Sequence, residues 1–341
     1  MSGFTVGLAI LGGLVLAALV AWNAWSTRRN TPRQAEVPVA AVPAGDAVQE
    51  RQEPVFDDVA LSPLPPPERK PGLDGLIDVL AQIAVDSVVS GEAALAALPP
   101  TRRAGSKPFA IEGRNDAGEW ETPRAGQRYT GFQAGVQLAN RSGALNEIEY
   151  SEFVMKTQAF ADAINGSAEF PEMRDEVARA RELDQFASTH DAQLGFTLRA
   201  RNAAWSPGYV QQNASRLGFV AGAIPGRLVL PASVAGGPPL LGLAFSTQAA
   251  LSEDPSHSAI REVTLSLDVP HVPRSEQPFV RMRDAAIALA ASMDGLITDD
   301  DGRVIPAEAL DAIGADLENL YDTLDARDLS AGSPQARRLF S

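Results

Sequence analysis

The acidic stretch at residues 297–308 has the residue types of a calcium-binding loop. Asp299, Asp301, Gly302 and Glu308 occupy the third, fifth, sixth and twelfth positions of the loop pattern in which carboxylates surround the ion. The first position also needs a carboxylate to close the cage, and here it is Ile297. Short apolar segments flank the acidic run on both sides. The pattern therefore predicts a solvated hairpin turn before a helix, and no metal site.

The histidines are the other candidates for acid–base chemistry. His190, His257 and His271 each lie at the boundary of an expected helix or strand, and no two of them share a catalytic motif. The chain has no cysteine, which excludes thiol chemistry, cysteine-ligated zinc and disulfides. We therefore expect a protein that is not an enzyme, with no catalytic residue and no cofactor.

An uncharged apolar segment at residues 4–25 predicts a transmembrane helix. At ~1.5 Å per residue it is about 33 Å long, the thickness of a bilayer's hydrocarbon core. A cleavable signal peptide is the competing interpretation, but basic residues do not precede the segment and no small-residue cleavage site follows it. Arg28 and Arg29 follow it directly, which places residues 1–3 in the periplasm and the rest of the chain in the cytoplasm.

Composition separates a linker from a globular region. Residues 26–72 are rich in proline and poor in large apolar side chains, which predicts a disordered linker. The net charge is −14, and blocks of Lys or Arg interleaved with aromatic residues are missing, so nucleic acid is not an expected partner.

Hydrophobic periodicity from residue 73 to residue 329 indicates two similar halves. Each half has alternating strand patterns, among them "RYTGFQAGVQLA" in the first and "REVTLSLDVP" in the second. Each then has a helix that stops at Asn-Gly or Asp-Gly, an interruption, and a second helix opened by proline. We predict repeats at residues 73–189 and 190–329, followed by a flexible tail at residues 330–341.

The second half and the overall layout resemble the bacterial cell-division protein family ZipA. The segments that carry the resemblance are "GPPLLGLAF" at 237–245, "VTLSLDVP" at 263–270 and "MRDAAIALAASMDGLITDDDGRVIPAEAL" at 282–310. The resemblance implies an α+β fold of two split β-α-β repeats, with antiparallel sheets covered by helices on one face. One transmembrane helix and a disordered linker would precede them.

In that family, the uncovered sheet face binds the extreme C-terminal peptide of FtsZ. Such a groove normally has large apolar side chains that repack around the ligand. If Leu194, Phe196 and Leu198 point into the core, smaller and more polar residues face outward here. The residues expected to bind the partner are Gly195, Thr197, Ile224, Leu228, Ala244, Ser246, Gln248, Thr264 and Ser266.

The resemblance implies a single-pass anchor in the bacterial inner membrane that serves the division septum. Its expected partner is the FtsZ C-terminal peptide or another component of the division machinery. The alternative is a membrane-tethered scaffold with the same fold that assembles through its own repeats into a homo-oligomer and does not bind FtsZ. The polarity of the outward face distinguishes the two, because an apolar face favours peptide binding.

Overall fold

The computed structural model describes residues 32–35, 72–234, 237–252, 258–299 and 301–341. The chain divides into two compact units, and each is described by itself. Within the described residues, unit 1 comprises 32–35, 193–234, 237–252, 258–268 and 276–315 without residue 300, and unit 2 comprises 72–192, 269–275 and 316–341.

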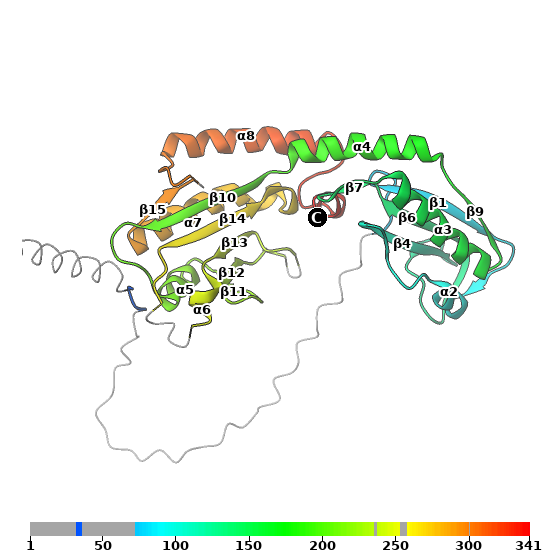
Figure 1. Ribbon diagram of the computed structural model, residues 1–341, viewed down its shortest axis with the longest axis horizontal. Helices are drawn as coiled ribbons and strands as arrows, with labels where there is room; N and C mark the ends of the chain where they lie inside the picture. Colours follow the sequence, from blue (N-terminus) through cyan, green and yellow to red (C-terminus); the bar gives the residue numbers. More distant parts are fainter. Residues whose placement is uncertain (1–31, 36–71, 235–236, 253–257, 300) are drawn as a thin grey trace, which may run out of the picture. The chain divides into compact units, whose positions relative to one another are not determined.

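Unit 1 is built on an antiparallel sheet (Figure 1). Its strands lie in the order β11-β12-β13-β14-β10-β15. The strands are β10 (Gln193–Ala200), β11 (Val220–Ala221), β12 (Arg227–Leu230), β13 (Leu241–Ala244), β14 (Glu262–Asp268) and β15 (Gly295–Thr298).

One face of this sheet is buried under helices. Helix α7 (Pro278–Met293) packs on β10 and β14, and α5 (Pro207–Ser215) packs on α7. Side chains alternate along β14, so Val263, Leu265 and Leu267 are buried. Phe196 of β10 meets Phe279 of α7 with ring centroids 6.4 Å apart. Because side chains alternate, the other face of β10 and β14 carries small or polar residues, among them Gly195, Thr264 and Ser266.

Unit 2 has a second antiparallel sheet, in the order β3-β4-β6-β1-β9, with β2 on β6 and β5 on β4. The strands are β1 (Asp78–Val85), β2 (Val89–Ser90), β3 (Arg103–Ala104), β4 (Lys107–Asn115), β5 (Trp120–Glu121), β6 (Arg128–Gln137) and β9 (Gly166–Glu169), with a separate hairpin of β7 (Ala139–Asn140) and β8 (Gly143–Ala144).

Helix α3 (Glu147–Ala163) covers the inner face of the unit 2 sheet. It starts with a capping box, in which the Asn146 side chain accepts from the backbone of Glu149 and the Glu149 side chain accepts from Asn146. Its buried stripe includes Phe153 and Phe160, which pack edge-on against Phe109 and Phe132 of the sheet.

The remaining helices are α2 (Gly91–Ala97), α4 (Met173–His190), α6 (Thr247–Ala250), α8 (Ala307–Asp325) and α9 (Pro334–Leu339), with 3-10 turns η2 (Val269–His271) and η3 (Arg274–Glu276). Residues of α8 up to Ala315 belong to unit 1, and those from Asp316 belong to unit 2. Residues 330–341, predicted as a flexible tail, contain α9, and they bury Leu339 and Phe340 at 0% and 1% exposure. These two apolar side chains hold the end of the chain in unit 2.

The strand orders of the two units correspond. The sheet of unit 1 contains β12-β13-β14-β10-β15 side by side, and the sheet of unit 2 contains β3-β4-β6-β1-β9; numbered by their order along the chain, the strands of the two paths follow each other in the same way. The first strand of each unit is therefore central: β10 lies between β14 and β15, and β1 lies between β6 and β9. The units nevertheless differ from the predicted repeats, because unit 2 also contains residues 269–275 and 316–341.

The predicted fold class and localisation need correction. Among the helices of the described residues, none is long and apolar enough to cross a membrane. This finding contradicts a fold that begins with a transmembrane helix and a single-pass localisation in the inner membrane. The fold is a mixed one, with antiparallel sheets packed against helices. The predicted periplasmic residues 1–3 and span 4–25 lie outside the described residues.

A short piece of the predicted linker is described. Arg33 forms a parallel bridge with Trp205, and its backbone donates to Ala204 O at 2.7 Å. Its guanidinium pairs with Asp294 at 3.0 Å. Residues 32–35 are thus an integral part of unit 1, while the rest of 26–71 lies outside the described residues.

Candidate functional site

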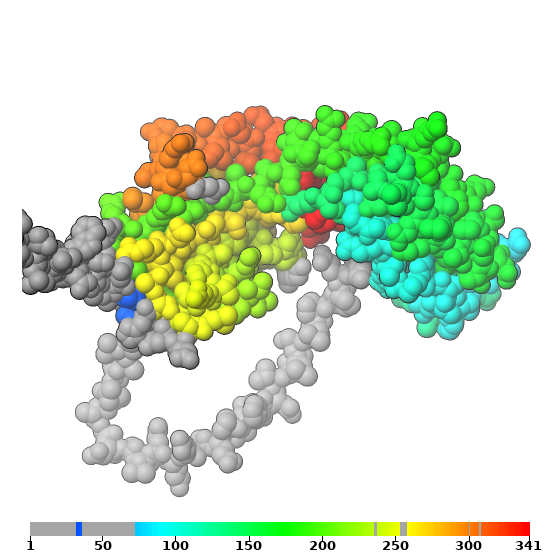
Figure 2. Space-filling model, viewed as in Figure 1, coloured from blue at the N-terminus to red at the C-terminus, as the bar shows by residue number. Residues whose placement is uncertain are grey.

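The face of the unit 1 sheet opposite α7 is the candidate binding surface, and we call it the open face. The ladder register pairs Gly195 with Ser266 and Thr197 with Thr264, and it pairs Ala244 with Thr264. These five predicted residues therefore share one face. Thr264 and Ser266 are exposed, whereas Thr197 is only 8% exposed and is not available to a partner. Figure 2 shows the strands β12 to β14 on the surface in the view of Figure 1.

Four other predicted residues do not lie on this face. Leu228 pairs with Leu243 in the buried row and is only 4% exposed, because its neighbour Val229 takes the outward position of β12. Ser246 is the N-cap of α6, and Gln248 lies in that short helix, so both have left the strand. Ile224 lies in the turn between β11 and β12 and is 52% exposed.

Two apolar residues that were not predicted extend the open face. Val229 pairs with Gly242, which pairs with Ser266, and Val220 pairs with Val229. The row therefore runs from Val220 and Val229 through small residues to Gly195. Leu228 and Val229 are adjacent in an apolar run, so the sequence alone could not show which of them points outward.

The open face carries groups that can form hydrogen bonds with a peptide. Its centre holds hydroxyl, methyl and backbone groups, and Ser266 Oγ donates to Gly242 O at 3.4 Å. Charged side chains also belong to this face: exposed Arg227 pairs with Ala244 in the ladder, Asp268 lies at one end of β14, and Arg199 pairs with Glu262 at 3.7 Å at the other end. Hydroxyls beside an exposed sheet face can hydrogen-bond a peptide, but the central residues offer no acid or base.

The corresponding face of unit 2 is covered by its own chain. Gln82 pairs with Gln133, which fixes the register that the sequence left open and puts Gln82 on this face. The amide of Leu73 donates to Glu112 Oε1 at 3.0 Å, and Gln133 donates to Glu112 Oε2 at 2.8 Å. The Leu73 side chain lies over Gly135, where an added Cβ would be 2.5 Å from it. These contacts bury Glu112 and Gln133.

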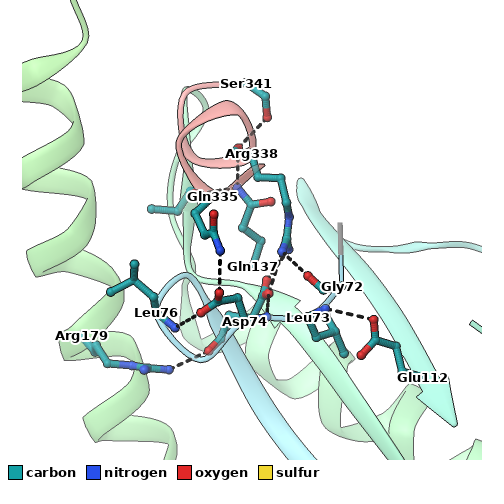
Figure 3. A network of polar contacts seen from close by, with 12 residues as sticks. Gly72, Leu73, Asp74, Leu76, Glu112, Gln137, Arg179, Gln335, Arg338 and Ser341 are labelled. Atoms are coloured by element: carbon teal, nitrogen blue, oxygen red, sulfur yellow. Dashed lines mark hydrogen bonds and ion pairs between the residues drawn. The ribbon is translucent and has the colours of Figure 1, made fainter. Parts of the chain in front are cut away.

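The C-terminal helix α9 closes one end of that face (Figure 3). Arg338 donates two hydrogen bonds to the carboxylate of Asp78, at 2.9 and 2.5 Å, and the Asp78 side chain is fully buried. Gln137 donates to Arg338 O at 2.7 Å, and Gln335 donates to Asp74 at 2.8 Å. Burial raises the pKa of Asp78, although the bonds from Arg338 oppose the change.

The acidic stretch at 297–308 forms the predicted turn. Thr298 and Val304 form an antiparallel bridge, and Gly302 has a φ of 81°. Asp299 is used inside the turn, because its Oδ1 accepts from the amide of Arg303 at 2.7 Å. Within the described residues, no group of three His, Asp or Glu side chains is placed to hold a metal ion.

The two histidines that the structure describes have structural contacts. The His190 ring stacks on the Phe186 ring with centroids 4.3 Å apart, and His190 Nδ1 lies within hydrogen-bond distance of Phe186 O, at 2.7 Å. His271 Nε2 lies 2.9 Å from Phe340 O. The third, His257, lies outside the described residues. His190 and His271 thus bond to backbone carbonyls and do not share a site.

A polar cavity of about 650 Å³ in unit 2 lies beside a buried lysine. Lys107, 1% exposed, donates to Asn140 Oδ1 at 2.8 Å and to Gly143 O at 2.5 Å, and its Nζ lies 3.4 Å from Ser142 Oγ. Burial lowers the pKa of Lys107. Because three oxygens of residues 140–143 surround it, the Lys107 ammonium group stabilises the turn between β7 and β8.

Neither a protein-family model nor a curated protein sequence matches this chain.

Proposed function

We propose that this protein is a non-catalytic binding protein that takes a peptide segment of a partner protein on the open face of unit 1. The observation that carries the proposal is the contrast between the two sheets. Thr264 and Ser266 in the centre of the unit 1 sheet are exposed, whereas Glu112 and Gln133 on the matching face of unit 2 are buried beneath Leu73.

The resemblance of residues 237–310 to the ZipA family supplies the partner. The proposed ligand is the C-terminal peptide of FtsZ or a segment of another division protein. Exposed Val220 and half-buried Val229 provide the apolar contact, and exposed Thr264 and Ser266 provide hydrogen-bonding groups. The small residues in the middle of the face predict an affinity on the order of micromolar.

The test is a titration of the full-length chain against a fluorescent FtsZ C-terminal peptide, followed by anisotropy. Ser266→Asp places a charge in the centre of the open face, and Ser215→Asp is the matched control, since Ser215 is an exposed residue on α5. We expect saturable binding that weakens at least about tenfold in Ser266→Asp, equivalent to about 1.4 kcal/mol, and is unchanged in the control.

Two outcomes would reject the proposal. One is the absence of saturation at a peptide concentration well above the expected micromolar affinity. The other is an equal loss in both variants, which would show an effect of charge in general. If sedimentation showed self-association that Ser266→Asp abolishes, the open face would be an interface between copies of the chain instead.

A further inference from the structure

Residues 32–35 of unit 1 add a short extended segment beside the start of α5 (Figure 1). The amide of Arg33 donates to Ala204 O at 2.7 Å, and Arg33 O accepts from the amide of Ser206 at 2.9 Å. These two bonds form a parallel bridge between Arg33 and Trp205. The backbone contacts are those of a peptide that adds to the edge of a strand.

The backbone groups that receive this segment lie in a buried part of unit 1. Ala204 and Trp205 are fully buried, and Ser206 is 2% exposed. The other side of Trp205 is already paired with Ile260, with both bonds at 2.8 Å. Without residues 32–35, Ala204 O and the amide of Ser206 would lose their partners, which costs free energy for groups that are shielded from water. This edge is therefore suited to bind an extended segment.

The side chains of the segment have specific contacts. Pro32 is buried, and its ring restricts the backbone to a φ that occurs in extended chains. The guanidinium of Arg33 donates to Asp294 Oδ2 at 3.0 Å. Ala35 lies against the first turn of α5, where a Cβ added to Gly208 would be 3.7 Å from the Ala35 Cβ. The site thus fits a proline, an arginine and a small side chain in an extended peptide.

The start of α2 in unit 2 corresponds to the start of α5 in unit 1. Each is the first α-helix after the first strand of its unit, β1 or β10, and each has a serine N-cap, Ser90 or Ser206. The residue directly before each cap, Val89 or Trp205, forms an antiparallel pair. The two helix starts are therefore comparable positions.

Unit 2 covers its helix start with a loop of its own, and this loop repeats the sequence of the N-terminal segment. Thr-Pro-Arg occurs at residues 31–33 and again at residues 122–124. Pro123 is buried, and Arg124 O lies so close to the first turn of α2 that a Cβ on Gly91 would be 1.9 Å from it. The same residue types thus cover comparable helix starts, from a nearby loop in unit 2 and from a distant segment in unit 1.

We propose that the start of α5 in unit 1 is a peptide-binding site for an extended Pro-Arg segment, and that residues 32–35 occupy it as an intramolecular ligand. Asp294 selects arginine, because a carboxylate accepts charge-assisted hydrogen bonds from a guanidinium. Arg33 precedes Asp294 by 261 residues, so a Pro-Arg peptide supplied in trans competes for the same contacts. The site is separate from the open face, because Asp294 caps α7, which covers the opposite face of the sheet.

The test uses the full-length chain with Arg33→Glu, which sets a carboxylate against Asp294 and releases the segment. The readout is hydrogen exchange at the amide of Ser206, which donates to Arg33 O. The amide of Trp205, which bonds to another part of unit 1, is the internal control. We expect exchange at Ser206 to become at least about tenfold faster and exchange at Trp205 to stay unchanged. Arg303→Glu is the matched control variant, because it reverses an 80% exposed arginine of the same unit.

The probe is the blocked peptide acetyl-TPRQA-amide, which has the sequence of residues 31–35. Added to the Arg33→Glu chain, it should restore slow exchange at Ser206 in a saturable manner, with a Kd on the order of 1 mM for so few contacts. The control peptide acetyl-TPEQA-amide should bind at least about tenfold more weakly, because its carboxylate faces Asp294. The wild-type chain should show little change with either peptide, since its own segment fills the site.

Unchanged exchange at Ser206 in Arg33→Glu would overturn the proposal, and so would a TPRQA peptide that does not restore protection. An equal acceleration at Trp205 would also reject it, because unit 1 would then have loosened as a whole. Equal protection by the two peptides would show that arginine is not recognised. Because Ser266→Asp is expected to leave TPRQA binding unchanged, failure here and failure of the open-face site remain distinguishable.

Discussion

Removing Arg338 should destabilise unit 2, because this residue neutralises a carboxylate that has no access to water. In Arg338→Ala the Asp78 side chain loses two charge-assisted hydrogen bonds and keeps the amide of Asp74 at 2.8 Å. Breaking a buried ion pair by deleting one partner costs about 3–5 kcal/mol. The Arg338 side chain is 19% exposed, so water can enter where it stood, and we expect the lower end, about 3 kcal/mol.

The assay is native-state hydrogen exchange of the full-length chain in increasing urea, read on fragments from β1 and α9. These fragments report the free energy of unfolding of unit 2, while fragments from β14 report unit 1 and serve as the internal control. A loss of about 3 kcal/mol corresponds to a fall of roughly 6–12 °C in the melting temperature of a unit of this size. Asp78→Asn keeps the shape of the side chain and should cost about 1–2 kcal/mol.

The destabilisation by Arg338→Ala should also depend on pH. Burial already raises the pKa of Asp78, and without Arg338 nothing comparable opposes that rise. An acid with a raised pKa in the folded state binds more protons there than in the unfolded state, so stability falls as the pH rises from the unfolded-state pKa to the folded-state pKa. The loss of stability caused by Arg338→Ala should therefore be larger at about pH 8 than at about pH 5. A loss below about 0.5 kcal/mol, or one that does not change with pH, would refute the assignment of Arg338 as the counter-ion of a buried charge.

Two further changes test single contacts in the two units. In the buried part of unit 1, Trp205 Nε1 donates to Met293 O at 2.7 Å, and Trp205→Phe removes this donor. The same exchange assay should show unit 1 destabilised by about 1–3 kcal/mol and unit 2 unchanged. Asn146→Ala removes the side-chain cap of α3 and should cost about 1 kcal/mol; Asn146→Asp should retain most of the stability, and equal losses in both would exclude capping as the cause.

The sequence predicted the elements of both units well where the period of its apolar residues is regular. β14 follows a strict alternation of buried and exposed residues, and α3 and α7 end just before the Asn165-Gly166 and Asp294-Gly295 pairs that predict helix stops. Alternation fails in "RLVL", where three consecutive apolar residues leave the register open. That is why Leu228 was assigned to the wrong face and Val229 was missed.

Long-range contacts account for the other differences. The role of Arg338 depends on Asp78, which precedes it by 260 residues, and a pattern within one segment cannot show such a pair. Residues 330–341 are short and polar enough to predict a flexible tail, but Leu339 and Phe340 find a buried place in unit 2. The short linker segment at Arg33 likewise becomes ordered only because Trp205 and Asp294 are there to receive it.

The difference between the two sheets follows from these same contacts. Each sheet buries its apolar residues under a helix and has a second, more polar face. The hydrophobic pattern of the sequence alone therefore does not distinguish the polar face of unit 1 from that of unit 2 as a binding surface. The unit 2 face meets the chain's own Leu73, and α9 closes its end, so Glu112, Gln133 and Gln137 have internal hydrogen-bond partners. Ser266 and Thr264 of unit 1 remain exposed. A ligand for the unit 2 face would have to displace satisfied hydrogen bonds, whereas one for the unit 1 face would displace only water, and this favours the open face of unit 1.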